Sequence, residues 1–178
     1  MFAKIFKRFQ LIFMPLVKQA AFVGVKMGEN NFVASKFWSS EPYLIEIGNN
    51  CQITNGVKMF THGGAQVVRR VYPKFDCFGK VIVGDFVYIG NNALIMPGVT
   101  IGDEVLIAAG SVVAKSVPSK VVVGGNPARI ICTIEEYIER NLTYNLNSKG
   151  LSSEDKKEKI LRASVDKLIS KNVMTLTF

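Results

Sequence analysis

An aliphatic side chain recurs at every sixth position through the middle of the chain, at Val83, Ile89, Ile95, Ile101, Ile107 and Val113. The position after each of them mostly holds Gly or Ala. A spacing of six fits neither the alternation of a long strand nor the turn of an α-helix. It fits a short strand followed by a tight corner, which makes one flat side of a triangular prism. We therefore expect coils of three such units, stacked so that their strands pair in parallel.

The same phase runs towards the N-terminus, through Met27, Val33, Ile47, Ile53 and Met59. Pairs such as Gly84-Asp85 stand between the aliphatic positions, where a corner needs unusual backbone angles. The interval from 33 to 47 is two residues longer than two hexads, which predicts a bulge near 37–42. Residues 61–80 hold glycines, paired arginines and a proline, and predict a loop that leaves a corner. The predicted β-helical domain spans residues 25–132.

The first 24 residues predict an amphipathic helix, which Pro15 should interrupt. Residues 1–26 contribute +5 of the net charge of +8 and contain no acidic residue. Because this excess is confined to one segment, it disfavours nucleic-acid binding, which needs a basic face. Three roles remain open for the helix: packing on the end of the prism, peripheral contact with a membrane surface, or a signal peptide with a minimal apolar region.

Residues 133–178 predict a helical extension, with helices over 133–146 and 153–171 and Ser153 as the cap of the second. The longest uninterrupted apolar run, 11–17, has seven residues, whereas a membrane-spanning helix needs about 20. We therefore expect no transmembrane helix.

Cysteine and histidine content restrict the chemistry further. The three cysteines, Cys51, Cys77 and Cys132, are widely spaced and form no CxxC pattern. This argues against a disulfide scaffold and a zinc cage, and it suits a reducing compartment. His62 is the only histidine, so a metal site built from two or three imidazoles of one chain is excluded. We expect no metal.

Several segments together resemble the hexapeptide-repeat acyltransferases, a family that folds as a left-handed parallel β-helix. The segments are SEPYLIEIG (40–48), ITNGV (53–57), FTH (60–62), IMPGVTIGD (95–103), AGSVV (109–113) and GNPAR (125–129). The branch that the chain looks most like holds sugar O-acetyltransferases of capsule, exopolysaccharide and O-antigen pathways, near maltose and galactoside acetyltransferases.

This resemblance implies a mainly β fold, a left-handed parallel β-helix with an N-terminal helix and C-terminal helices. It implies a homotrimer with active sites in the grooves between neighbouring prisms, acetyl-CoA as the acetyl donor and a carbohydrate acceptor. The need for acetyl-CoA favours a cytoplasmic location, with the inner face of the membrane as an alternative.

The resemblance gives His62 the role of catalytic base. Transfer of acetyl from a thioester to a hydroxyl needs a group that takes the hydroxyl proton, and a neutral imidazole suits this near neutral pH. Relatives commonly carry an acid directly after this histidine, whereas this chain has Gly63. Glu41 is our candidate either for orienting the ring or for holding the acceptor, and the alternative is an acid exposed at a corner without a role in the site. Trp38 and Tyr43 are candidate stacking surfaces for a sugar ring, with packing in the hydrophobic core as the alternative.

By motif position, the resemblance assigns coenzyme A contacts to Asn91, Ala109, Gly110, Ala114, Lys115 and Arg129. Small side chains let the pantetheine arm approach backbone amides, and the two cations can bind its phosphates. Two other functions stay open. One is N-acylation of an amino sugar or acetylation of an antibiotic, and the other is a non-catalytic β-helical binding or structural subunit.

Overall fold

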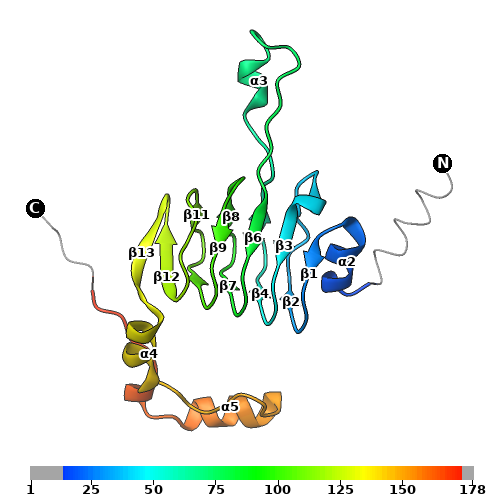
Figure 1. Cartoon of the computed structure of the whole chain (residues 1–178). Coiled ribbons are helices and arrows are strands. Elements are labelled where there is room, and N and C mark those ends of the chain that lie inside the picture. Colours follow the sequence, from blue (N-terminus) through cyan, green and yellow to red (C-terminus); the bar gives the residue numbers. More distant parts are fainter. Residues whose placement is uncertain (1–13, 174–178) are drawn as a thin grey trace, which may run out of the picture. The chain divides into compact units, whose positions relative to one another are not determined.

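The structure is a computed structural model of the chain and describes residues 14–173. The chain divides into two compact units, with the boundary between Ile134 and Glu135 (Figure 1). The first unit holds the repeats and the second holds most of the C-terminal helices. Each unit is described by itself.

Three sheets form the sides of a prism in the first unit, and their strands pair in parallel except at β13. Sheet A contains β1(Lys26–Met27), β3(Ile45–Ile47), β6(Val81–Val83) and β9(Thr100–Ile101) in that order. Sheet B contains β2(Phe32–Val33), β4(Gln52–Ile53), β7(Tyr88–Ile89), β10(Leu106–Ile107), β12(Val121–Gly125) and β13(Ala128–Thr133). Sheet C contains β5(Lys58–Met59), β8(Leu94–Ile95) and β11(Val112–Val113). The chain visits the three sheets in turn, which confirms the predicted parallel β-helix.

The register of the strands follows the sequence period. Ile89 pairs with Ile107 across β7 and β10, and Ile95 pairs with Val113 across β8 and β11. Each aliphatic position of the repeat therefore lies above its equivalent in the next coil. The side chains point inward, and Ile89, Ile95 and Ile107 are fully buried. Each such burial contributes about 1.5–3 kcal/mol relative to an exposed side chain.

Polar side chains hold the corners between sheets A and B together. The Asp85 carboxylate accepts the Asn49 N–H at 2.7 Å, and the Asp103 carboxylate accepts the Asp85 N–H at 2.8 Å. The Ser119 hydroxyl in turn accepts the Asp103 N–H at 2.9 Å. At each step a side chain pairs with the backbone of the preceding coil. Gly84 leaves room for this contact, because a Cβ there would collide with the Asp103 carboxylate.

Both ends of the β-helix are closed. At the N-terminal end, α2(Leu16–Val23) buries Ala20 and packs Leu16 and Val17 against the core. At the other end, β13 turns back and pairs antiparallel with β12. For the described part of the N-terminal segment, packing on the prism is the arrangement found. The apolar stripe predicted within residues 1–13 lies outside the described residues. Between residues 14 and 173, no helix is long and apolar enough to cross a membrane.

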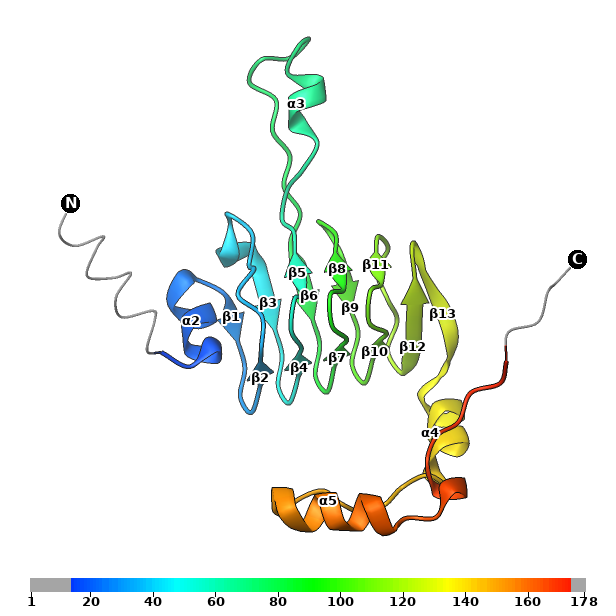
Figure 2. The ribbon, with the colours of Figure 1, turned by 180° about the vertical axis from the view of Figure 1, so that it is seen from behind.

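The corner between sheets C and A is irregular in the first two coils. In the first coil, the short 3₁₀ helix η1(Pro42–Leu44) precedes β3 and absorbs the extra residues. In the second coil, the chain leaves the prism after β5, forms α3(Ala65–Val68) and returns to β6. Figure 2 shows this excursion as a long arm that leaves and rejoins the prism at one point.

The C-terminal part forms α4(Ile134–Leu142), α5(Ser153–Arg162) and the 3₁₀ helix η2(Val165–Lys167). Both helices are shorter than predicted, since 133–146 and 153–171 were expected. The second ends because Ala163 adopts an extended conformation. Its cap is Ser152, whose hydroxyl accepts the Asp155 N–H, and not Ser153 as predicted. No residue of α4 or α5 is buried.

Candidate active site

His62 lies at the neck of the excursion, at the corner between sheets C and A. Its backbone forms an antiparallel bridge with Phe78, and the Thr61 carbonyl accepts the Gly79 N–H at 2.8 Å. The outgoing and returning chains are therefore paired where they leave the prism. As a consequence, the backbone of His62 is held by the β-helix and does not depend on the outer part of the loop.

A carboxylate from the first coil meets the imidazole from the second. Glu41 Oε2 lies 2.7 Å from His62 Nδ1, and the Thr61 hydroxyl donates to the same oxygen at 2.6 Å. An ionised carboxylate only accepts, so the Nδ1 atom must carry the proton. His62 Nε2 is then the basic nitrogen of the neutral ring. Gly63, the residue after His62, has no carboxylate that could pair with the ring. Glu41 supplies this carboxylate instead, which is one of the roles expected for it.

Hydrogen bonding favours the ionised form of Glu41. The hydroxyl of Thr61 is the main cause that lowers the pKa of Glu41, and the bond to His62 and the charge of its protonated form lower it further. Partial burial acts in the opposite direction, because it disfavours the charged form of the carboxyl. The Glu41 side chain is 16% exposed and that of His62 is 37% exposed. The carboxylate is therefore enclosed, while the imidazole can reach a bound molecule.

An apolar hollow of about 650 Å³ opens beside the imidazole. Phe60 and Phe78 contribute aromatic rings to it, and the ring centroids of Phe78 and His62 are 5.9 Å apart. The third coil contributes Leu94 and the 96–98 turn. The other lining residues are Gly63, Gly64, Cys77 and Gly79. Apart from His62, its lining carries no strongly basic or acidic side chain.

Trp38 does not serve as the predicted stacking surface. Its side chain is only 6% exposed and belongs to the hydrophobic core. The extra residues of the first coil bring the ring inward, where its large apolar area is buried. Tyr43 is exposed. The aromatic faces beside His62 belong instead to Phe60 and Phe78.

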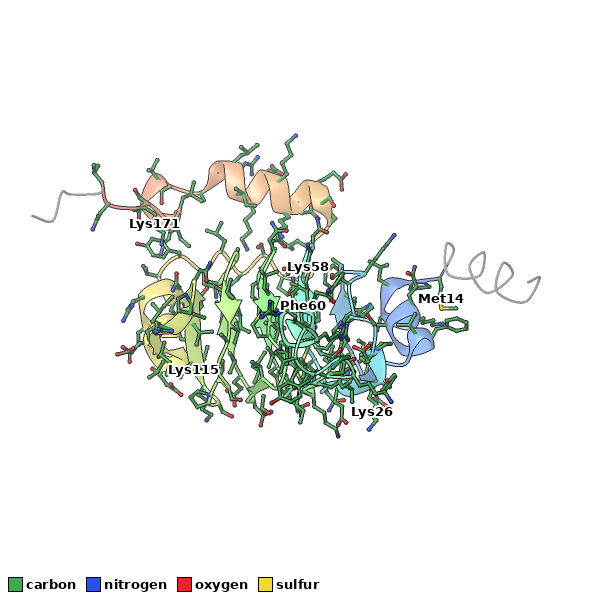
Figure 3. All side chains as sticks on the ribbon, turned by 90° about the horizontal axis from the view of Figure 1, so that it is seen from above. Met14, Lys26, Lys58, Phe60, Lys115 and Lys171 are labelled. Carbon is green, nitrogen blue, oxygen red and sulfur yellow. The ribbon has the colours of Figure 1, made fainter. Side chains whose placement is uncertain are left out.

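The predicted coenzyme A residues separate into two groups. Ala114, Lys115 and Arg129 line one hollow of about 350 Å³, at the end of the β-helix away from α2. Figure 3 shows Lys115 on these last coils and Phe60 nearer the middle of the prism. Two cations beside small side chains suit the phosphates and narrow arm of coenzyme A.

The second group lies at the corner between sheets B and C. The Asn91 carbonyl accepts the Gly110 N–H at 2.8 Å, and the Asn91 side chain accepts the Asn55 N–H at 3.1 Å. Asn91, Ala109 and Gly110 are exposed there. A single chain therefore presents the six predicted residues on two different corners. The described residues contain no group of three His, Cys, Asp or Glu side chains that could hold a metal ion.

A family model of the bacterial transferase hexapeptide, with six repeats, matches residues 80–115. Protein CapG of Staphylococcus aureus is 48% identical over 121 residues, which cover 67% of this chain and 70% of CapG. The chain belongs to the hexapeptide-repeat transferases. The family resemblance of the sequence is thereby confirmed. Two further curated relatives are matched over only 54% and 59% of their own length.

Two solved acetyltransferase structures share this fold. A maltose O-acetyltransferase from Clostridium difficile 630 aligns with a TM-score of 0.52 and 25% identity, over 66% of this chain and 75% of that one. A galactoside acetyltransferase in complex with coenzyme A aligns with a TM-score of 0.51 and 26% identity, over 69% and 73% of the two chains.

Sequence reasoning missed the residues that surround the dyad of Glu41 and His62. Phe60 and Thr61 immediately precede His62 in the quoted Phe-Thr-His segment, so their position could have drawn attention. Ser39, whose Oγ lies 2.8 Å from Thr61 Oγ1, is far from them in sequence and was not considered. Phe78 reaches the hollow through the pairing of the loop neck, which the repeat does not predict.

Proposed function

We propose that the protein is an acetyl-CoA-dependent O-acetyltransferase that acts on a sugar hydroxyl. The observation that carries this proposal is the ring of His62, held by Glu41 through Nδ1 and bordering an apolar hollow. Membership of the hexapeptide-repeat transferases supports it, as do maltose and galactoside acetyltransferases among the structural neighbours.

In this proposal His62 is the catalytic base. Nε2 takes the proton of the acceptor hydroxyl as its oxygen attacks the thioester carbonyl, which forms the new C–O bond. The C–S bond then breaks, and the imidazolium returns the proton to the departing sulfur. Glu41 stabilises the positive charge that the ring carries in between. No covalent enzyme intermediate is needed, because both substrates are bound together.

The hollow favours an acceptor with an apolar face. Phe60 and Phe78 offer aromatic surfaces of the kind that stack on the C–H face of a sugar ring. The absence of strongly basic and acidic side chains from the described lining suits an uncharged sugar unit next to His62. As the pathway we propose bacterial surface polysaccharide synthesis, of capsule, exopolysaccharide or O-antigen.

The active assembly in this proposal is a homotrimer. Asn91, Ala109 and Gly110 lie at a different corner from Ala114, Lys115 and Arg129, so one coenzyme A molecule would meet both groups most simply between two prisms. Because acetyl-CoA is the donor, we propose the cytoplasm as the location. Contact of residues 1–24 with the inner membrane surface belongs to the same proposal.

The test is acetyl transfer from labelled acetyl-CoA to a panel of neutral sugars, amino sugars and antibiotics, with products identified by mass spectrometry. We expect O-acetylated sugar, and a loss of at least about 100-fold in rate for His62→Ala, the size of a general-base contribution. Activity on amino groups alone would overturn the proposed acceptor. Normal turnover of His62→Ala, or no binding of coenzyme A in calorimetry, would overturn the proposed mechanism.

A further inference from the structure

We propose that Thr61 is a positioning residue: its buried hydroxyl fixes the Glu41 carboxylate on His62 and thereby decides which ring nitrogen acts as the base. The inference deepens the proposed function and rests on it, because the choice of nitrogen matters only if His62 accepts a proton. Thr61 itself is buried and is not among the residues that line the hollow.

Thr61 is buried, and both its hydroxyl and its backbone are hydrogen-bonded. Its side chain is completely buried, with an exposed fraction of 0%. Its hydroxyl lies 2.6 Å from Glu41 Oε2, the oxygen that lies 2.7 Å from His62 Nδ1. The backbone is held on both sides, since the Thr61 carbonyl accepts the Gly79 N–H and the Thr61 N–H donates to Ser39 Oγ at 3.3 Å.

The hydrogen bonds can run in only one direction. A threonine hydroxyl has one proton, and an ionised carboxylate can only accept, so this proton points to Glu41. Ser39 Oγ, 2.8 Å from Thr61 Oγ1, must then donate to Thr61. The result is a chain from Ser39 through Thr61 to Glu41, which accepts from His62 at the same oxygen. The negative charge of Glu41 thus determines the direction of every hydrogen bond in this series.

Without the Thr61 hydroxyl, one of the two hydrogen bonds to Glu41 Oε2 is lost. The carboxylate can then rotate away from Nδ1, and its charged form is less favoured. This agrees with the pKa of Glu41, which the Thr61 hydroxyl lowers more than any other contact does. Among the described residues, His62 is the titratable group whose contact and charge also lower that pKa. Thr61 therefore acts on the ring through Glu41.

The experiment compares Thr61→Val, which keeps the shape and removes the hydroxyl, with Thr61→Ser, which keeps the hydroxyl. His62 is the only histidine, so ¹⁵N NMR of the full chain with labelled histidine reports its tautomer without assignment. In the wild type and Thr61→Ser we expect the neutral ring protonated at Nδ1. In Thr61→Val we expect a shift towards protonation at Nε2. We expect kcat to fall about tenfold or more, as for loss of a hydrogen bond to a charged group, with KM for acetyl-CoA within twofold.

Three results would overturn the inference: an unchanged tautomer signal in Thr61→Val, wild-type kcat in that variant, or equal impairment of Thr61→Ser. If Thr61→Val does not fold, Ser39→Ala replaces it, and we expect a smaller shift in the same direction; no shift there also overturns the inference. The NMR measurement separates this inference from the proposed function. A tautomer shift in a chain that acetylates no acceptor supports the role of Thr61 and refutes the acetyltransferase.

Discussion

Replacing Glu41 with Gln keeps the size of the side chain and removes its charge. The amide cannot stabilise a protonated His62 as a carboxylate does. Its oxygen can still accept from Nδ1, but its NH₂ group can also turn towards the ring and favour the other tautomer. The contact is short, at 2.7 Å, and comes from a side chain that is 16% exposed. The substitution should therefore act on catalysis far more than on folding.

The expected loss in kcat is about 100-fold. The corresponding Asp→Asn change in a buried serine-protease triad costs about 10⁴-fold. Here the imidazole is 37% exposed, so water screens the charge and supplies alternative partners. The loss should accordingly fall well below the triad value. It should remain above the effect of a neutral hydrogen bond, because the lost partner is charged.

The assay is a double-mutant cycle on acetyl transfer with Glu41→Gln, His62→Ala and the two combined. If Glu41 acts through His62, adding Glu41→Gln to His62→Ala should change the rate by less than about threefold, because the two residues work as one unit. If the rate losses of the two single substitutions multiply in the double variant, Glu41 does not act through His62. Such a result would assign Glu41 instead to the other role considered for it, that of holding the acceptor.

Three further outcomes are expected. Lys115→Ala combined with Arg129→Ala should raise KM for acetyl-CoA about tenfold or more with little change in kcat, because both cations line the hollow assigned to the phosphates. Lys120→Ala, outside that hollow, should leave KM unchanged. Equal effects of the two sets of substitutions would contradict the phosphate assignment. Coenzyme A should slow alkylation of Cys77, the one exposed cysteine of the three, and undiminished alkylation at saturation would place the thiol end elsewhere. The difference in free energy of unfolding between wild type and Glu41→Gln, measured by denaturant unfolding, should be present above about pH 4.5. It should vanish as the pH falls through the lowered pKa of Glu41. A difference that persists in stronger acid would point to packing as its cause.

The repeat made the prism predictable because each buried position depends on its own six-residue unit. Ile89 and Ile107 pair across neighbouring coils, as their spacing requires. The excursion was predictable for the opposite reason, since residues 61–80 break the pattern. The end of α5 at Arg162 was not, because residues 163–171 contain no Gly or Pro that would mark the stop and α5 buries no residue.

The site was predictable only in part. His62 and Glu41 stand in segments that resemble the family, and the structure brings them together. The prediction of Trp38 as a stacking surface was wrong, because the ring is buried in the core. An aromatic residue in an irregular corner can turn inward or outward, and its sequence neighbours do not decide which. Thr61 was overlooked because its importance comes from a contact with another coil. Side-chain contacts between coils at an irregular corner cannot be predicted from the six-residue repeat.

The stacking of coils also fixes a length. His62 stands in the second coil at the corner between sheets C and A, and Lys115 stands at the same corner two coils further on. Strands in a sheet are about 4.8 Å apart, so the two are offset along the prism by roughly 10 Å. In the proposed function, the β-helix therefore sets the distance between the catalytic imidazole and the cations that bind the phosphates of coenzyme A. We expect that adding or deleting one whole coil between them changes this offset by one strand spacing, about 4.8 Å, and lowers the rate of acetyl transfer because side chains cannot make up that distance.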